Sequence, residues 1–272
     1  MSVNTTQSSL PQVLLDRSAQ LLMVVVWTSS LLFGLYILAF YGAAFFADPE
    51  VWNQNLNGLF VRGNSAATSG IGVHFLGGGI ILALGCIQLL PIVRTRVPAV
   101  HRFVGRVYLL SCLAASIGGT AFVLLSGTIG GFYMDIGFGL YGVLMFVCTV
   151  QTFRHAIASN ISVHRRWALR LFALAIGSWL YRMDYGIWYE LTGLVGHTDT
   201  FDGWFDNVMS FFFFIPNLFV VEMFIRGQQP TAGDLQKSAC ALLLFVATGV
   251  VALGTYSFTA LYWGPAILAI FS

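Results

Sequence analysis

Residues 21–46 read LLMVVVWTSSLLFGLYILAFYGAAFF and contain no charged side chain. About 20 apolar residues in a helix, rising ~1.5 Å each, cross the ~30 Å of hydrocarbon in a bilayer. This run is longer than that, and it also exceeds the roughly 7 to 15 apolar residues of a cleaved signal peptide. We therefore expect residues 21–46 to stay in the membrane as a first spanning helix.

Six further hydrophobic runs follow with little polar sequence between them. They cover residues 73–93, 102–126, 132–153, 167–191, 205–225 and 239–270. The chain is 57% hydrophobic and 9% charged, whereas roughly 25% of the residues of a soluble domain are charged. The pattern predicts an all-α, polytopic bundle of about seven transmembrane helices. We expect a polar tail over residues 1–20 and one membrane domain over residues 21–272.

The basic residues gather in alternate connections. One side of the predicted membrane receives Arg17, Arg94, Arg96, Arg102, Arg106, Arg154, Arg165, Arg166, Arg170, Arg226 and Lys237. Only Arg62 falls in a connection on the other side, and Arg182 falls inside a span. Short loops rich in arginine and lysine stay in the cytoplasm. The N-terminus is therefore predicted to be cytoplasmic and the C-terminus extracytoplasmic, in a bacterial inner (plasma) membrane.

Two histidines on the basic side, His101 and His164, each open a helix within a Val-His-Arg tripeptide. Two neutral imidazoles can ligate one b-type haem, whose propionates Arg102, Arg106 and Arg170 would neutralise. We therefore name His101 and His164 as metal ligands of one haem b, or as part of a quinone site. An anionic headgroup or substrate would suit the same residues. An ordinary basic interface, set by topology alone, also accounts for them.

A haem at this pair has a direct spectroscopic test. Dithionite-reduced protein should show the sharp visible bands of a low-spin haem, because two imidazoles would fill both axial positions. The bands should vanish in both His101→Ala and His164→Ala. Colourless protein from haem-replete cells would eliminate the haem hypothesis.

A second polar group lies towards the opposite side of the membrane. It comprises His74, Arg182, Asp206, Ser210 and Asn217. Ionisable groups inside a bilayer cost at least ~2.5 kcal/mol each unless they are paired, so they usually face the bundle interior. We expect Arg182 to point inward and contact Asp206 or another polar group. The group would then form an outward-facing pocket for a lipid-like ligand.

Several other residues carry structural predictions. Ser111, Ala115 and Gly119 recur at every fourth position, which predicts close contact with another helix. Pro216 removes a backbone donor, which predicts a bend. Glu222 has Arg226 one turn away as its expected partner. Four cysteines show no metal-binding spacing and are interpreted as packing residues: Cys86, Cys112, Cys148 and Cys240.

Three segments resemble a known family. They are HFLGGGIILALGCIQLLPIVRTRVPAVHRFVGRVYLL at residues 74–110, HRRWALR at 164–170 and PNLFVVEMFIR at 216–226. They are similar to the membrane proteins grouped as domain of unknown function 2306, over roughly residues 70–226, with HRxxGRxY and PNLxxxE as the specific elements. The resemblance implies a polytopic membrane protein and brings no established reaction. Its pattern falls on His74, Gln88, Arg94, Arg96, His101, Arg102, Gly105, Arg106, His164, Trp167, Arg170, Asn217 and Glu222.

The His-Arg-x-x-Gly element is also loosely similar to helix starts in cytochrome b561 and ferric-reductase proteins. Those proteins pair histidines well inside the membrane and on both leaflets, and this sequence departs from that pattern. It contains no Walker loop, HExxH or GxSxG motif. The arginines at span ends are explained by topology, so we expect no nucleic-acid partner.

Three hypotheses about function stay open. The first is a membrane redox protein that binds one haem or a quinone. The second is a membrane enzyme or binding protein for a lipid-like substrate, and the third is a structural or accessory subunit of a membrane complex. The lipid bilayer is the expected partner in all three.

Overall fold

The computed structural model describes residues 9–54, 59–60 and 62–265, and these residues form helices and connections without a β-strand. The first helices are α1 (Leu10–Ile37), α2 (Ala43–Ala47), α3 (Ser65–Leu89), α4 (Pro91–Arg96), α5 (Pro98–Ser126) and α6 (Gly131–Ile157). They are followed by α7 (Ile161–Ala175), α8 (Gly177–Thr192), α9 (Trp204–Phe212), α10 (Ile215–Gly227) and α11 (Asp234–Phe258). A π-helical turn, Leu38–Gly42, joins α1 to α2, and another, Thr259–Trp263, follows α11.

Six helical segments of the described chain are long and apolar enough to cross a membrane. They are Leu10–Phe46, Ser65–Leu89, Pro98–Ser126, Gly131–Ile157, Trp204–Gly227 and Asp234–Leu261. The predicted fifth span, residues 167–191, falls on α7 and α8, which are not among these six; we infer that this interrupted pair makes a seventh passage. The expected all-α fold with about seven spans is confirmed.

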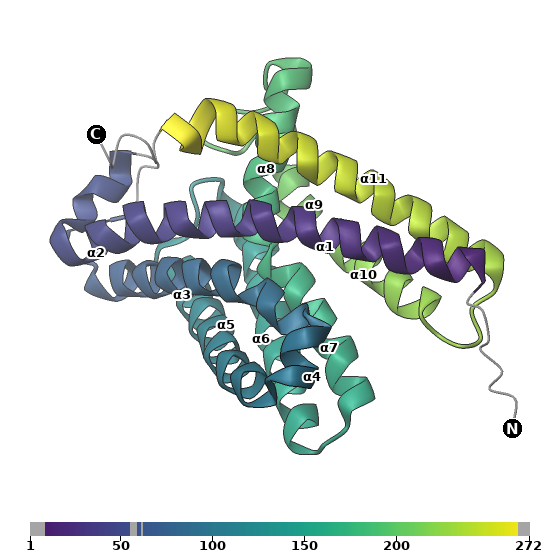
Figure 1. The fold of residues 1–272 in the computed structure, drawn as a ribbon. Helices are drawn as coiled ribbons and strands as arrows, with labels where there is room; N and C mark the ends of the chain where they lie inside the picture. The colour runs from purple at the N-terminus through teal and green to yellow at the C-terminus, as the bar shows by residue number, and fades with distance from the viewer. Residues whose placement is uncertain (1–8, 55–58, 61, 266–272) are drawn as a thin grey trace, which may run out of the picture.

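Figure 1 shows how the spans are arranged. Helices α1 and α11 lie side by side along one edge of the molecule. Helix α3 packs between α1 and α5, and α6 packs between α5 and α7. The α8 helix returns to contact α11. The α7–α8 pair contacts α6 through α7 and α11 through α8, so it packs between these two parts of the bundle.

The contact between α3 and α5 brings two backbones together. A Cβ atom added at Gly118 would lie 2.5 Å from the carbonyl oxygen of Gly70, and one added at Gly77 would lie 3.0 Å from that of Ser111. A Cβ at Gly119 would lie 2.8 Å from His74 Nδ1. Small residues let transmembrane helices approach this closely. The close contact predicted from Ser111, Ala115 and Gly119 is confirmed.

Two of the membrane passages are broken, and the breaks touch each other. Pro216 in the first turn of α10 has no N–H, so the helix stops after Phe212 and restarts at Ile215. A Cβ at Gly177, where α8 starts, would lie 3.5 Å from the Phe213 ring and carbonyl oxygen. The helix is interrupted beside Pro216, where we predicted a bend.

Side chains satisfy carbonyl oxygens at both breaks. Asn217 Nδ2 donates to the Phe213 carbonyl oxygen at 2.6 Å, and the Tyr141 hydroxyl donates to that of Leu174 at 2.8 Å. A bilayer interior offers no water to backbone groups that lack helical partners. These two side chains therefore allow helix interruptions within membrane passages.

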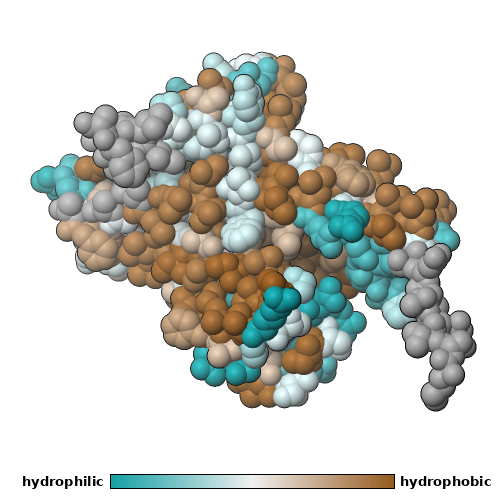
Figure 2. Space-filling model, in the orientation of Figure 1, coloured by the Kyte–Doolittle hydropathy of each residue, from teal (hydrophilic) through white to brown (hydrophobic). Residues whose placement is uncertain are grey.

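The outer surface of the spans is apolar. Figure 2 shows extensive hydrophobic surface over the helices, with hydrophilic residues collected at several helix ends. Leu110 is 66% exposed, Leu124 80% and Leu253 59%. Leucines exposed to this extent along helices of membrane-spanning length fit a surface that faces lipid tails.

The helices at the two ends of the chain have other bounds than the predicted segments. Helix α1 begins at Leu10, so much of the segment 1–20 predicted as a polar tail is helical; residues 1–8 lie outside the described part. The predicted last span, residues 239–270, is α11 and its π-helical turn up to Trp263. Residues 266–272 also lie outside the described part. The polar residues at the start of α1 are helical because no helix-breaking residue separates them from the apolar run that follows.

The orientation in the membrane stays a prediction with a simple test. Reporter domains fused after Lys237 should read cytoplasmic, and reporters fused after Ser272 should read extracytoplasmic, because the arginine-rich connections stay inside. The seven-passage topology fails if both fusions report the same compartment.

Candidate functional site

The most completely built polar site surrounds Asp206, in the first turn of α9 at the end away from the arginines. The Asp206 side chain is 0% exposed. Its Oδ1 accepts hydrogen bonds from Tyr185 Oη at 2.6 Å and His197 Nδ1 at 2.7 Å. Its Oδ2 accepts from the backbone N–H groups of Thr198 and Gly203, each at 3.1 Å.

These four bonds determine the tautomer of His197. A carboxylate offers about four acceptor positions and no donor, so His197 Nδ1 must carry the hydrogen that Asp206 accepts. The neutral imidazole then has a lone pair on Nε2. The His197 side chain remains 16% exposed, so this nitrogen belongs to a ring that a ligand can reach from the membrane surface.

Asp206 and His197 form a hydrogen-bonded pair, which we call the dyad. A hydrogen-bonded chain extends from the dyad into the bundle. The Tyr181 hydroxyl donates to the Tyr185 hydroxyl at 3.2 Å, and Tyr185 donates to Asp206. Tyr181 in turn packs edge to face on Phe138 and Phe213, beside the helix breaks. The chain therefore connects the loop between α8 and α9 to the middle of the bundle.

Aromatic side chains surround the dyad. The Phe201 ring centroid lies 4.8 Å from that of His197, and the Trp188 and Trp204 centroids are 6.0 Å apart nearby on α8 and α9. Trp188 Nε1 also donates to the Val195 carbonyl oxygen at 2.8 Å. Tryptophans concentrate at the level of lipid headgroups. The dyad therefore lies near the membrane–water interface.

The rest of the α8–α9 loop is held by Asp202. Its Oδ1 accepts from the hydroxyls of Thr198 at 2.6 Å and Thr200 at 2.8 Å. These bonds lower the pKa of the Asp202 carboxyl. Because the shift is downward, the contribution of these bonds is present at neutral pH and is lost as the pH falls through the lowered pKa.

Sequence reasoning named Asp206 but missed His197 and Tyr185. His197 is one of several polar residues in a short loop and matches no motif. Tyr185 and Asp206 lie on different helices, so no helical periodicity relates them. The available signal was a histidine and a carboxylate at opposite ends of one short loop, which a fold of this size brings together.

The other residues of the predicted outer pocket separate into three places. Ser210 donates to the Asp206 carbonyl oxygen at 2.9 Å, which places it beside the dyad. His74 Nδ1 lies 2.9 Å from the Ala115 carbonyl oxygen, to which it donates, and Arg182 is close enough to His74 to interact electrostatically. Asn217 lies at the helix break, as described above.

Arg182 does not contact Asp206; the other polar group that we expected as its alternative is a backbone carbonyl. Arg182 NH1 donates to the Ser178 carbonyl oxygen at 2.8 Å, and its guanidinium carbon lies 5.1 Å from the Phe33 ring centroid. Asp206 has no acceptor position left, because two backbone groups, His197 and Tyr185 fill all four. Arg182 points towards α1 and is stabilised there by a ring face and a backbone carbonyl.

At the arginine-rich end, His164 and His101 lie close enough to interact electrostatically. His164 Nδ1 lies 2.9 Å from the Thr152 carbonyl oxygen and must donate to it, which leaves a lone pair on Nε2. Gln88, oriented so that its amide finds partners, donates to His101 Nδ1 at 3.2 Å and accepts from the Gly105 N–H at 3.1 Å.

The two histidines are therefore different tautomers. His164 presents an unprotonated Nε2, as an iron ligand must. His101 accepts at Nδ1, so its Nε2 carries the proton and is not free to bind iron. The residues as arranged do not fit a haem held by both imidazoles, and the spectroscopic test given above decides the question.

Arg170, which we placed beside haem propionates, makes an ion pair instead. Its Nε and NH2 atoms donate to the two carboxylate oxygens of Glu222 at 3.0 and 2.9 Å. The Arg170 guanidinium also lies 5.0 Å from the Trp167 ring centroid. The expected pairing of Glu222 with Arg226 is wrong, because the planar guanidinium of Arg170 on α7 provides a bidentate contact.

This ion pair should contribute measurably to stability. The side chains of Arg170 and Glu222 are 25% and 36% exposed, so we expect Arg170→Gln or Glu222→Gln to lower the free energy of unfolding by about 1–2 kcal/mol. The double variant should lose less than the sum of the two single losses, and a double-mutant cycle in detergent measures this. Strict additivity would show that the pair has no coupling.

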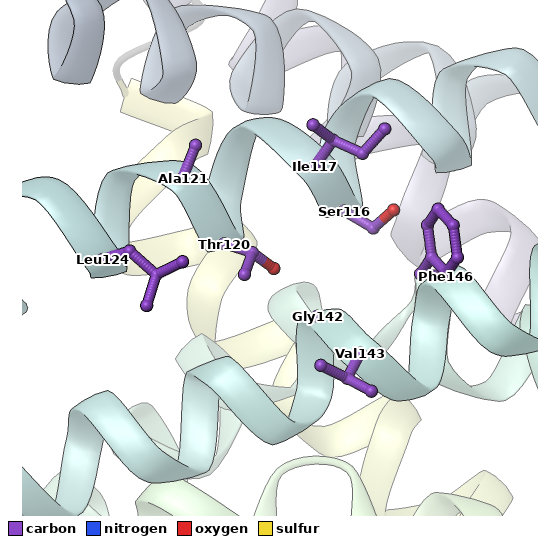
Figure 3. Close-up of a pocket in the computed structure, with 8 residues that line it drawn as sticks. All are labelled: Ser116, Ile117, Thr120, Ala121, Leu124, Gly142, Val143 and Phe146. Carbon is purple, nitrogen blue, oxygen red and sulfur yellow. The ribbon is translucent and has the colours of Figure 1, made fainter.

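A groove between α5 and α6 offers less chemistry. Figure 3 shows its lining, and its volume is about 320 Å³. It is lined by Ser116, Ile117, Thr120, Ala121, Leu124, Gly142, Val143 and Phe146. Two hydroxyls and no ionisable group lie among these residues. Within the described residues no group of three or more His, Cys, Asp or Glu side chains is placed to hold a metal ion, and the four cysteines are buried free thiols.

The fold and the apolar surface define a polytopic α-helical membrane protein. A family model described as "Predicted membrane protein (DUF2306)" matches residues 71–225, more than half of the chain. The chain belongs to this family, and the resemblance noted from its sequence is confirmed. No curated protein and no solved structure matches it.

Proposed function

We propose that this protein is a membrane enzyme for a lipid-like substrate, with His197 as its general base. The observation that carries the proposal is the bond between His197 Nδ1 and the wholly buried Asp206. A buried carboxylate that holds one imidazole nitrogen fixes the ring and stabilises the imidazolium that forms when the other nitrogen takes a proton. The Nε2 atom of this ring, whose side chain is partly exposed, is then the proton acceptor.

The surroundings of the dyad indicate the substrate class. The site lies beside Trp188 and Trp204 at the level of lipid headgroups. A substrate there must place its polar group in the interface and its apolar part along exposed side chains such as Leu191, which is 72% exposed. We infer that Nε2 accepts a proton from a hydroxyl group, or from water, beside the headgroup of an amphipathic molecule.

The test uses a variant that keeps the hydrogen bond to Asp206. In His197→Asn the amide nitrogen replaces Nδ1 as donor, but the variant has no group in place of Nε2. Protein in nanodiscs of defined phospholipids should convert lipid to a product detectable by mass spectrometry, and His197→Asn should reduce the rate by about 100-fold or more. His155→Asn, at the arginine-rich end, is the matched control and should leave the rate unchanged.

A second measurement does not depend on the substrate. Nitrogen NMR of labelled histidine should show that the neutral His197 ring carries its proton on Nδ1 and none on Nε2. A proton on Nε2 in the neutral ring would overturn the assignment of His197 as base. Equal product formation by wild type and His197→Asn would overturn the proposed enzyme.

A further inference from the structure

The arginine-rich end carries a concentration of positive charge that the fold does not neutralise. Between residues 91 and 170 the only acidic residue is Asp135. Asp135 lies at the opposite end, where it accepts hydrogen bonds from the backbone and hydroxyl of Thr128 at 2.6 and 2.7 Å. Apart from Arg170, the arginines of this segment make no ion pair with any described residue.

Three donors lie near one another where α4 packs against α5. Arg94 on α4 and Arg102 on α5 both lie close enough to His101 to interact with it electrostatically. Because Gln88 donates to His101 Nδ1, the Nε2 of His101 carries a hydrogen and is also a donor. The corner therefore presents two guanidinium groups and an imidazole N–H, and among the described residues no carboxylate pairs with either guanidinium.

Apolar side chains surround the same corner. Ile92 is 53% exposed, Val100 47% and Phe103 66%. They alternate with the arginines along α4 and the first turns of α5, where α5 enters the membrane. A soluble phosphate has no apolar part that could contact this surface, whereas a phospholipid has both an anionic group and acyl chains.

We propose that the α4–α5 corner is a binding site for an anionic phospholipid, with its phosphate held by Arg94, Arg102 and the His101 Nε2–H group. The acyl chains lie along the exposed face of α5, beginning at Phe103. Gln88 and Gly105 position the imidazole: a Cβ at Gly105 would lie 2.9 Å from an atom at the amide end of Gln88, so glycine permits the close approach of this side chain. The site is independent of the His197 dyad at the other end.

The test compares arginines of the corner with an arginine elsewhere on the same face. Protein in nanodiscs is released and analysed by native mass spectrometry after titration with phosphatidylglycerol against phosphatidylcholine. Arg94→Gln and Arg102→Gln should each weaken phosphatidylglycerol retention by about 5-fold, since a basic residue near an anionic surface contributes about 1 kcal/mol. Arg154→Gln, at the end of α6, makes the same charge change outside the corner and should alter retention little.

Variants of His101 test the geometry. His101→Gln keeps an N–H donor near the position of Nε2 and should retain the lipid, whereas His101→Leu should lose it to a similar degree as the arginine variants. Equal losses in Arg154→Gln and Arg102→Gln would overturn the proposal in favour of diffuse attraction. Displacement of the lipid by millimolar inorganic phosphate would overturn it in favour of a site for soluble phosphate.

Discussion

Asp206→Ala should lower the free energy of unfolding by about 3–5 kcal/mol, the loss expected when one partner of a buried, hydrogen-bonded charge pair is removed. The substitution leaves the Tyr185 hydroxyl, His197 Nδ1 and the backbone N–H groups of Thr198 and Gly203 without their acceptor. Each unsatisfied buried donor carries its own desolvation cost. Asp206→Asn should be intermediate, because its amide replaces one accepting oxygen with a donor.

The cysteines of the protein allow the loss of stability in Asp206→Ala to be measured. Cys86, Cys112, Cys148 and Cys240 are buried free thiols, so a thiol-reactive fluorophore reports thermal unfolding in detergent. Asp199→Asn is the matched control, since Asp199 is exposed in the same loop and makes no hydrogen bond with a described residue. If Asp206→Ala unfolds at the wild-type temperature, the buried network is not a stabilising element.

The dyad shows where sequence reasoning reached its limit. Hydrophobic runs predicted the spans because lipid demands a fixed helix length and an apolar surface, and both are local properties of a sequence. Pro216 predicted a break for a local reason too, since its missing N–H acts within one turn. His197 and Asp206 meet only because a loop folds back on the start of α9, and nothing in their spacing requires that geometry.

The expected pairings that the fold does not contain have a common cause. We expected Glu222 to pair with Arg226 by nearness in sequence, and we named Asp206 before any other polar group as the partner of Arg182 by direction of entry into the membrane. The fold gave Glu222 a partner 52 residues away on α7, because a bidentate guanidinium contact outweighs an i,i+4 contact on a surface. All four acceptor positions of Asp206 are filled by nearer donors, so Arg182 packs on the ring of Phe33 instead.

The break in the predicted fifth span had a weaker signal. Ile176 and Gly177 sit in the middle of an apolar run, and glycine alone does not stop a membrane helix. The interruption depends on the neighbouring break at Phe213, against which Gly177 packs. The interruption at Gly177 therefore packs against the interruption at Phe213. Neither segment alone contains a signal for this contact.

The second large effect on stability is expected at the close contact between the backbones of α3 and α5. Gly118→Ala places a Cβ 2.5 Å from the Gly70 carbonyl oxygen, which is a backbone atom and cannot rotate away. The two helices must separate along a packed contact, so we expect a loss of about 1–3 kcal/mol, and more for Gly118→Leu. The thiol-based unfolding assay measures this loss.

A neighbouring glycine provides the control. A Cβ at Gly78, on the partner helix α3, meets no atom within 4 Å. Gly78→Ala should therefore be neutral or should stabilise the protein by up to about 1 kcal/mol, because alanine favours a helix over glycine. Equal effects of Gly118→Ala and Gly78→Ala would mean that helix propensity decides both, and that the α3–α5 contact can open without cost. Opposite signs are expected, since only Gly118 faces a backbone that cannot move without moving the whole of α3.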